Sequence, residues 1–308
     1  MSIIIWTIQL ILVPALSPLF LGVLRKIKAH FQNRVGASIF QPYRNLWKLF
    51  HKDEVMSKDA SWIFRFAPYL IFTITVVLGA SIPLFSTLFI NNLLSDFLTI
   101  IYLVALSTFF LALAGMDVGS AFGGFGSSRE MTLAALTEGG LIFSLLALSF
   151  LAHSTNLFSI ATAISTLPLF DFMPIILVFI AFVIIMLCET AHFPFDNPAT
   201  HLELTMVHEA MILEYSGKRL ALIEWAAANK FLIFLALGVN MFFPWGLTAQ
   251  SNIWSVVLAL AVFNIKILIL TTFVAILESS IAKYRYFRLP DLLFTSFILS
   301  AMAILLIL

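Results

Sequence analysis

Eight long apolar segments, separated by shorter polar connections, dominate the pattern of hydrophobic and polar positions along the chain. Each segment is long enough to cross a bilayer as a helix, which takes about 20 residues. The pattern therefore predicts an all-α, polytopic membrane protein with about eight transmembrane helices in a single membrane domain over residues 1–308. The predicted spans run approximately over residues 3–24, 66–90, 97–116, 131–153, 172–189, 220–246, 254–278 and 292–308.

The composition agrees with this pattern. Hydrophobic residues make up 61% of the chain and charged residues 11%, whereas an ordinary soluble domain is roughly 25% charged. A soluble protein is therefore excluded, and the net charge of +1 offers no basic patch for a nucleic-acid partner. Because the single cysteine, Cys188, cannot hold an iron–sulfur cluster, we expect any redox cofactor to belong to a partner subunit.

The lysines and arginines gather in alternate connections. Of the 17 in the chain, nine lie in residues 25–65 and six lie at residues 129, 218–219 and 283–288, whereas connections 91–96, 154–171 and 247–253 carry none. Cytoplasmic loops carry the excess of Lys and Arg. We therefore expect a multi-pass protein of the cytoplasmic (inner) membrane, with both termini outside and large cytoplasmic loops.

Five ionisable residues fall within the predicted spans or at their ends: Glu138, Glu224, Lys230, Lys266 and Glu278. A charge at mid-membrane costs about 2.5–3.5 kcal/mol on insertion scales, so such residues need a partner or a function. One interpretation is Lys–Glu pairing that fixes the helix register, and the other is a proton or cation relay. Glu224 and Lys230 lie on different faces of one helix, so their partners are expected on other helices.

The stretch ETAHFPFDNPATHLELTMVHEAMILEYSG holds an acidic cluster without any Lys or Arg. Because each proline removes a backbone donor, Pro194 and Pro198 should end the preceding helix. Either Asn197-Pro198 or Thr200-x-x-Glu203 can then start a new helix, of which the second is a capping box, and Gly217 is placed to end that helix. The carboxylates of the stretch are Glu189, Asp196, Glu203, Glu209 and Glu214, of which Glu203 and Glu214 would share a helix face.

Two other motifs carry little chemistry. HEAMI lacks the second histidine of a zinc HExxH motif because position 212 is isoleucine, and His201 and His208 lack a third ligand, so no metal site is expected. The segment MDVGSAFGGFGSSRE lacks the lysine of a P-loop and does not follow a strand. We expect it to form a tight, flexible connection between helices.

Three regions resemble the complex I subunit 1 family. They are the acidic stretch with its E-x-x-x-x-PFD segment and EYS ending, the loop FQNRVGASIFQPYRNLWKLFHKDEV with its N-R-x-G segment, and Arg129 nine residues before Glu138. The resemblance covers essentially the whole chain. The shortened first loop, the longer LTMVHEAMILEYSG segment and FFPWG at 242–246 are most similar to the membrane anchor of formate hydrogenlyase and hydrogenase-4 complexes.

The resemblance implies a subunit without a catalytic role that joins a cytoplasmic redox arm to antiporter-like membrane subunits within the lipid bilayer. The arm would consist of hydrogenase-like large and small subunits and an iron–sulfur subunit, which hold a nickel–iron centre and iron–sulfur clusters. Carboxylates of this chain would line a funnel from the arm into the membrane, or form a solvated face that meets basic residues of a partner. The implied proton or ion pathway contains Glu138, Glu189, Asp196, Glu203, Glu209, Glu214, Glu224, Lys230, Lys266 and Glu278.

The basic first loop would contact the redox arm or lipid headgroups. Arg34, Arg44 and Lys48, with Tyr43 and Trp47, form an amphipathic surface segment that suits either partner. Arg129 completes the implied docking set.

Two further functions stay open at this point. One is the same subunit in an NADH-quinone oxidoreductase, with a lipid tunnel between the first and sixth spans; the shortened first loop argues against it. Glu224 also falls about one turn before the position where quinone-reducing enzymes carry their sixth-span glutamate. The other function is a solitary ion-coupled transporter, which would often show two repeated halves with broken spans, and the chain shows no such repeat.

Overall fold

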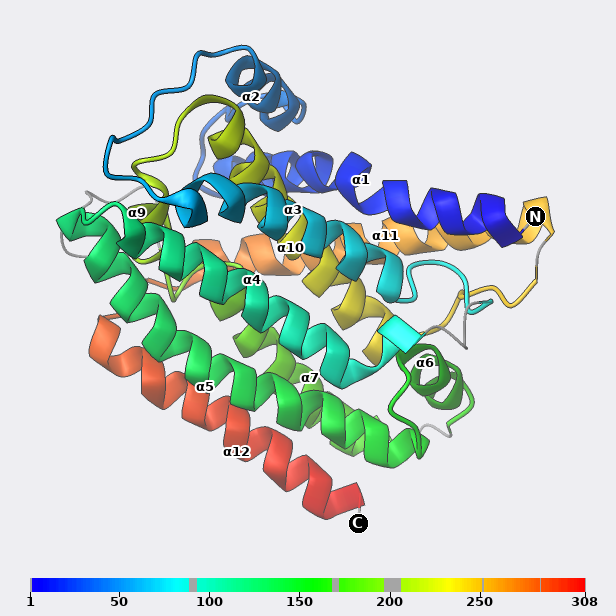
Figure 1. The fold of residues 1–308 in the computed structure, drawn as a ribbon. Helices are drawn as coiled ribbons and strands as arrows, with labels where there is room; N and C mark the ends of the chain where they lie inside the picture. The colour runs from blue at the N-terminus through cyan, green and yellow to red at the C-terminus, as the bar shows by residue number, and fades with distance from the viewer. Residues whose placement is uncertain are drawn as a thin grey trace.

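A computed structural model of the protein describes residues 2–88, 93–167, 172–196, 206–250, 252–282 and 284–307. These residues form a bundle of long helices without a strand in any of the described ranges (Figure 1). The helices are α1 Ser2–Phe31, α2 Gln41–Phe50, α3 Trp62–Ser81, α4 Phe97–Asp117, α5 Ala121–Ala152, α6 Leu157–Ser165, α7 Phe172–Glu189, α9 His208–Ile212, α10 Gly217–Phe242, α11 Ile253–Ser280 and α12 Leu289–Ile307, with short 3-10 turns at Leu93–Ser95 and Tyr286–Arg288.

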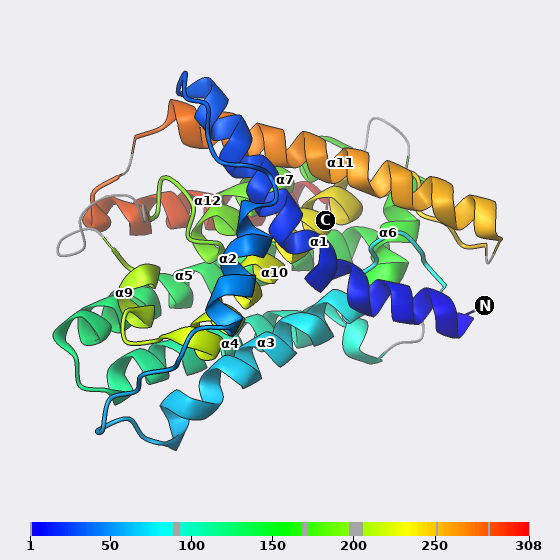
Figure 2. The ribbon, with the colours of Figure 1, turned by 90° about the horizontal axis from the view of Figure 1, so that it is seen from above.

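Seven of the described helices are long and apolar enough to cross a membrane, and α7 is a shorter apolar helix. The predicted all-α, polytopic membrane protein with eight apolar helices is therefore confirmed. Both ends of the chain point toward one end of the bundle, and α2 and α9 lie at the other end (Figure 1). Seen from above, α11 lies on one flank and α3 and α4 on the opposite flank (Figure 2).

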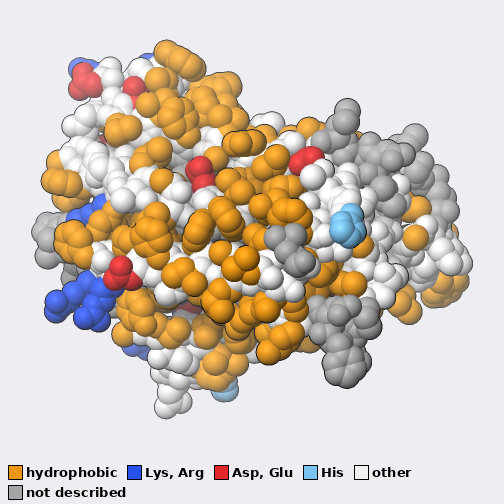
Figure 3. All heavy atoms as spheres, turned by 90° about the horizontal axis from the view of Figure 1, so that it is seen from below, with side chains coloured by type: hydrophobic (Ala, Val, Ile, Leu, Met, Phe, Trp, Pro, Cys, Tyr) orange, Lys and Arg blue, Asp and Glu red, His pale blue; other side chains and the backbone are white. Residues whose placement is uncertain are grey.

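One face of the protein shows the distribution of hydrophobic and basic side chains that is expected for a membrane protein. Hydrophobic side chains extend across its middle, and Lys and Arg side chains gather at the end that also holds α2 and α9 (Figure 3). The bundle interior is filled by aromatic and aliphatic side chains such as Phe182, Phe234 and Phe242, all fully buried. Apolar residues therefore cover the lipid-facing surface as well as the core.

The start of α5 contradicts the prediction of a flexible Gly/Ser connection. The helix begins at Ala121, capped by Ser120, ten residues before the predicted span. A Cβ at Gly123 would lie 2.1 Å from the Gly115 carbonyl oxygen, and one at Gly126 would lie 2.8 Å from the Val207 carbonyl oxygen. The glycines therefore permit close contact between helices and do not break this one.

The second span also ends earlier than predicted, at Ser81 and not near residue 90. The apolar residues that follow belong to a buried non-helical segment, in which Thr87 donates its N–H to the Thr248 carbonyl and Thr248 donates to Phe85. Asn240 donates to two carbonyls of the same segment. Backbone groups freed by the end of the helix thus find partners inside the protein, as they must at membrane depth.

Candidate functional site

The site is built around the end of α7. The helix stops at Glu189, before Pro194, as predicted. Ala191 adopts a left-handed conformation with φ of 54°, and the N–H groups of Ala191 and His192 close the helix end by donating to the Cys188 and Leu187 carbonyls. This arrangement is a Schellman-type ending, and it turns the chain back over the bundle.

An ion pair lies directly beneath this turn. Glu189 at the end of α7 binds Lys230 of α10 through a contact of 2.7 Å between Oε2 and Nζ. The Glu189 side chain is only 4% exposed. Lys230 also donates to Oγ1 of Thr108 on α4 at 3.3 Å. The predicted partner of Lys230 on another helix is thus confirmed, and three helices meet at this lysine.

Asp196, which follows the turn, binds the backbone at the start of α9. Its buried Oδ2 accepts the backbone N–H groups of Val207 at 3.2 Å and His208 at 3.0 Å. Burial first, and then the positive charge of Lys230, lowers the pKa of His208 to about 4. His208 is therefore neutral at pH 7 although it lies among carboxylates.

A second ionic cluster surrounds the buried carboxylate of Glu278 at the end of α11. Its Oε1 lies 2.6 Å from His192 Nδ1 and accepts the N–H of Phe193 at 3.3 Å. Its Oε2 lies 2.8 Å from Nζ of Lys28 on α1. The cluster joins α1 and α11 to the turn after α7.

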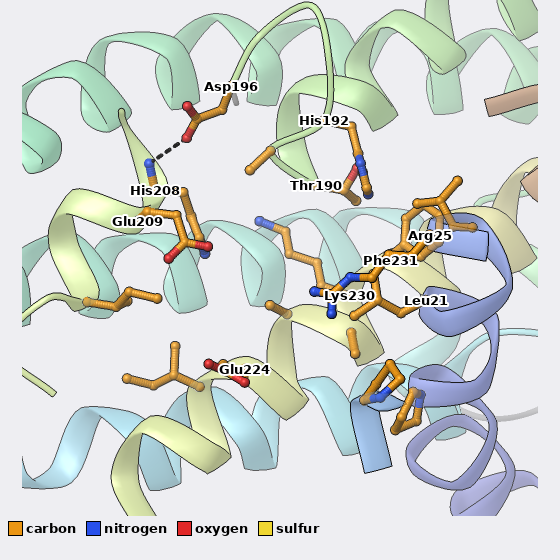
Figure 4. Close-up of a pocket in the computed structure, with 18 of the residues that line it drawn as sticks. Leu21, Arg25, Thr190, His192, Asp196, His208, Glu209, Glu224, Lys230 and Phe231 are labelled. Carbon is orange, nitrogen blue, oxygen red and sulfur yellow. Dashed lines mark hydrogen bonds between the residues drawn. The ribbon is translucent and has the colours of Figure 1, made fainter. Parts of the chain in front are cut away.

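The two clusters border one cavity of about 360 Å³ at the end of the bundle that holds α2. We call it the charged cavity. Figure 4 shows Lys230 and Glu224 reaching it from α10, Arg25 from α1, and His208 and Glu209 from α9. Its ionisable lining residues are Arg25, Lys28, Glu189, His192, Asp196, His208, Glu209, Glu224, Lys230 and Glu278.

Three carboxylates that line the charged cavity influence one another. Burial raises the pKa of Glu209, and the negative charges of Glu224 and Asp196 raise it further, whereas Arg25 opposes the shift. Such a group changes its protonation closer to neutral pH than an ordinary glutamate does.

A groove of about 690 Å³ lies between α4 and α5. We call it the α4/α5 groove; it is lined by residues of α4 from Thr99 to Phe109 and by Met131, Ala134 and Glu138 of α5. Thr108 lines the groove and accepts the hydrogen bond from Lys230, which lines the charged cavity. The two spaces are thus connected through one lysine and one hydroxyl group.

Two other predicted pathway residues, Lys266 and Glu214, do not line either of these two spaces. Lys266 of α11 donates to Oδ1 of Asn240 at 3.0 Å. Glu214 is exposed after the end of α9. The predicted helix from Thr200 to Gly217 is wrong in its last part, because α9 ends at Ile212 and Gly217, with φ of 55°, begins α10. Glu203 lies outside the described residues.

The predicted docking residues divide into two groups. Arg34, Arg44 and Lys48 are exposed around α2, next to Trp47, whose side chain is also exposed. Arg129 instead is half-buried and binds within the chain, donating to the Met206 carbonyl and lying over the ring of Tyr286.

Sequence reasoning missed several residues of the site. Glu130 of α5 lies within electrostatic range of Glu189, Asp196 and Lys230. Its position about two turns before Glu138 on the same helix is a signal that could have found it. Thr108, Arg25 and Lys28 gave no comparable signal, because hydroxyls are common in apolar helices and basic residues are common at helix ends.

The fold and the site define a polytopic membrane protein with a charged cavity and ion pairs inside its helix bundle. Comparison with known proteins then gives the family: residues 3–308 match the family model described as NADH dehydrogenase. The chain belongs to this family, which is that of complex I subunit 1. It is thus a membrane subunit of a complex related to complex I.

Three relatives illustrate the similarity. The chain is 34% identical to hydrogenase-4 component C of Escherichia coli K12 over 96% of its own length and 92% of the relative. It is 30% identical to formate hydrogenlyase subunit 4 of the same organism, over 96% of each chain. Identity to an NADH-quinone oxidoreductase subunit of Anaplasma phagocytophilum is 25% over 87% of this chain and 84% of that one.

A solved structure shares the fold. A chain of the membrane-bound sulfane sulfur reductase, an archaeal respiratory membrane complex, superimposes with a TM-score of 0.84 over 100% of both chains, at 17% sequence identity. This likeness supports the helical architecture described above.

Proposed function

We propose that this chain is the membrane anchor and ion-coupling subunit of an energy-converting nickel–iron hydrogenase complex of the hydrogenase-4 or formate hydrogenlyase type. It would join a cytoplasmic redox arm to antiporter-like membrane subunits in the cytoplasmic membrane. The relatives named for hydrogenase-4 and formate hydrogenlyase support the type of complex. The observation that carries the coupling role is the charged cavity and its link to the α4/α5 groove through Lys230 and Thr108.

The helix α2 supports the docking part of this proposal. One side of α2 covers the charged cavity with Pro42, Asn45 and Leu46. Its other side exposes Arg44, Trp47 and Lys48, spaced three and four residues apart and so on one face. A subunit that binds this exposed face would lie directly over the cavity.

The lining of the cavity supports coupling by charge. A redox centre in the bound arm would change its charge during turnover, and carboxylates in a partly dry site respond to a nearby charge by taking up or releasing protons. Glu209, with its raised pKa, lines the cavity and is half-buried. The Glu189–Lys230 pair lines the same cavity, and Lys230 also binds Thr108.

The alternative in a quinone-reducing enzyme has one observation in its favour. The cavity lies between α1 and α10, which are the first and sixth apolar helices when the shorter α7 is counted, and that alternative places a lipid tunnel there. Three acidic and three basic side chains on α1, α7, α9 and α10 nevertheless line it: Glu189, Glu209, Glu224, Arg25, Lys28 and Lys230. Ions and water suit such a lining better than a lipid chain does.

Purification of the tagged chain from its native membrane, followed by subunit identification and metal analysis, tests the assembly. We expect a nickel-containing large subunit, a small subunit and an iron–sulfur partner, together with antiporter-like membrane subunits. A flavin- and NADH-binding arm would instead establish the quinone-reducing enzyme, and a chain that purifies alone yet moves ions in vesicles would establish the transporter.

Two variants of the complex test the coupling. Glu189→Gln and Glu209→Gln should each reduce ion movement in vesicles at least tenfold while the subunits still co-purify and the redox reaction continues. Asp291→Asn is the matched control, because Asp291 is exposed at the start of α12 and does not line the cavity. Full coupling in both cavity variants would refute the assignment of the charged cavity.

A further inference from the structure

The α4/α5 groove has the properties of a site for a transmembrane helix. The helix α4 contributes to it from Thr99 to Phe109, a length of about 15 Å at 1.5 Å per residue. Tyr102 and Phe109 border the groove with 65% and 48% of their surface exposed. Ala105 and Ala134 line it between these larger side chains, and small residues are the ones that let a second helix approach closely in a membrane.

Glu138 distinguishes this groove from an ordinary lipid-facing surface. It lies near the middle of the long helix α5 and lines the groove. Within the described residues, no hydrogen-bond donor or cation contacts its carboxylate. Lys230, the cation whose charge acts on Glu138, binds Glu189 and Thr108 instead. A carboxylate left against lipid at this depth is costly, so the groove needs a partner of opposite charge.

We propose that the α4/α5 groove receives a transmembrane helix of a neighbouring membrane subunit, and that this helix sets a lysine or arginine against Glu138. The partner cation would then complete a row of charges: the partner's cation, Glu138, Lys230 and Glu189. Thr108 links the groove to Lys230, since it lines the groove and accepts a hydrogen bond from Lys230. The inference rests on the proposed membrane assembly, but not on the chemistry of its cytoplasmic arm.

Site-specific photo-crosslinking in the intact membrane tests the occupant. Benzoylphenylalanine replaces Tyr102 or Phe109 in the groove, and replaces Phe273 as a matched control, because Phe273 is an exposed aromatic residue of α11 on the opposite flank. We expect both groove positions to crosslink to a membrane-embedded segment that contains Lys or Arg, and the control position not to crosslink to that segment. Crosslinks to lipid alone, to a second copy of this chain, or to a helix without a basic residue would overturn the proposal.

A charge exchange tests the role of Glu138. Glu138→Lys should lower recovery of the crosslinked partner at least tenfold, and replacing the partner's cation by glutamate in the same cells should restore it. Equal recovery of the partner with the unmodified proteins, with Glu138→Lys alone and with the exchanged pair would contradict the proposed ion pair. The same purification also tests the proposed function. Absence of the cytoplasmic subunits from the purified, unmodified protein would refute the proposed assembly. Their presence without any crosslink from the groove would refute only the proposed docking of a helix in the groove.

Discussion

Removing the positive charge of Lys230 should destabilise the protein strongly. The side chains of Glu189 and Lys230 are 4% and 13% exposed, and their charged atoms lie 2.7 Å apart. Truncating one partner of a buried pair costs about 3–5 kcal/mol, because the other charge stays buried without compensation. Lys230→Met keeps a long apolar side chain and removes only the charge and its donors. We therefore expect the free energy of unfolding to fall by about 3–5 kcal/mol.

Lys266→Met is the matched control, since Lys266 also lies within a span but bonds to an amide. Its Nζ donates to Oδ1 of Asn240 at 3.0 Å. Removing a charge at this depth recovers about 2.5–3.5 kcal/mol, whereas leaving the buried amide oxygen unbonded costs about 1–3 kcal/mol. The two effects partly offset each other, so the same substitution here should give a result between a loss of about 0.5 and a gain of about 2.5 kcal/mol.

Reversible unfolding in mixed detergent micelles, followed by tryptophan fluorescence during titration with sodium dodecyl sulfate, measures both variants. The double variant Glu189→Gln with Lys230→Met should lose less stability than the sum of its single variants, by at least about 1 kcal/mol, because the residues are in direct contact. If Lys230→Met costs no more than Lys266→Met, the ion pair does not stabilise the bundle and the reasoning fails.

The remaining predictions concern close packing and pH. Gly123→Ala places a methyl group 2.1 Å from the Gly115 carbonyl oxygen and should lower the free energy of unfolding by about 1–3 kcal/mol. Gly124→Ala, with no neighbour within 4 Å, should raise it by up to about 1 kcal/mol. Equal values for the two variants in the same titration would contradict the tight α4–α5 contact. The pKa of His208 is about 4 in the folded protein against an ordinary 6.5, so the unfolded chain binds a proton first as the pH falls. The free energy of unfolding should therefore keep its full contribution from neutral His208 above pH 6.5 and decline toward pH 4 by up to about 3 kcal/mol. His208→Gln should flatten the plot of this free energy against pH over the same range.

The hydrophobic pattern predicted the fold because membrane depth sets the length of each span. It predicted the bounds of α7 correctly, where a charged residue and a turn follow the apolar run at once. It failed at the start of α5, because glycine in a membrane helix is used for close packing as well as for bends. It also extended α3 too far, since the apolar residues 82–85 are buried in a non-helical segment that looks the same in composition.

The sequence also predicted most of the charged groups of the site, but not their arrangement. That Lys230 needs a partner on another helix follows from its spacing to Glu224, yet the choice of Glu189 depends on how α7 and α10 pack. The turn at Ala191 adds to this arrangement, because it closes the end of α7 just after Glu189 and leads the chain to Asp196. Such an ending depends on the local conformation of a residue whose type does not announce it.

The position of Lys230 also bears on whether the buried charges are structural or functional. A pair that only fixed the helix register would satisfy itself within the packed interior. Lys230 instead divides its donors between Glu189 and the hydroxyl of Thr108, which faces a different space. Under the proposed coupling role, the contact that stabilises the bundle would also pass a change of charge from the charged cavity to the α4/α5 groove.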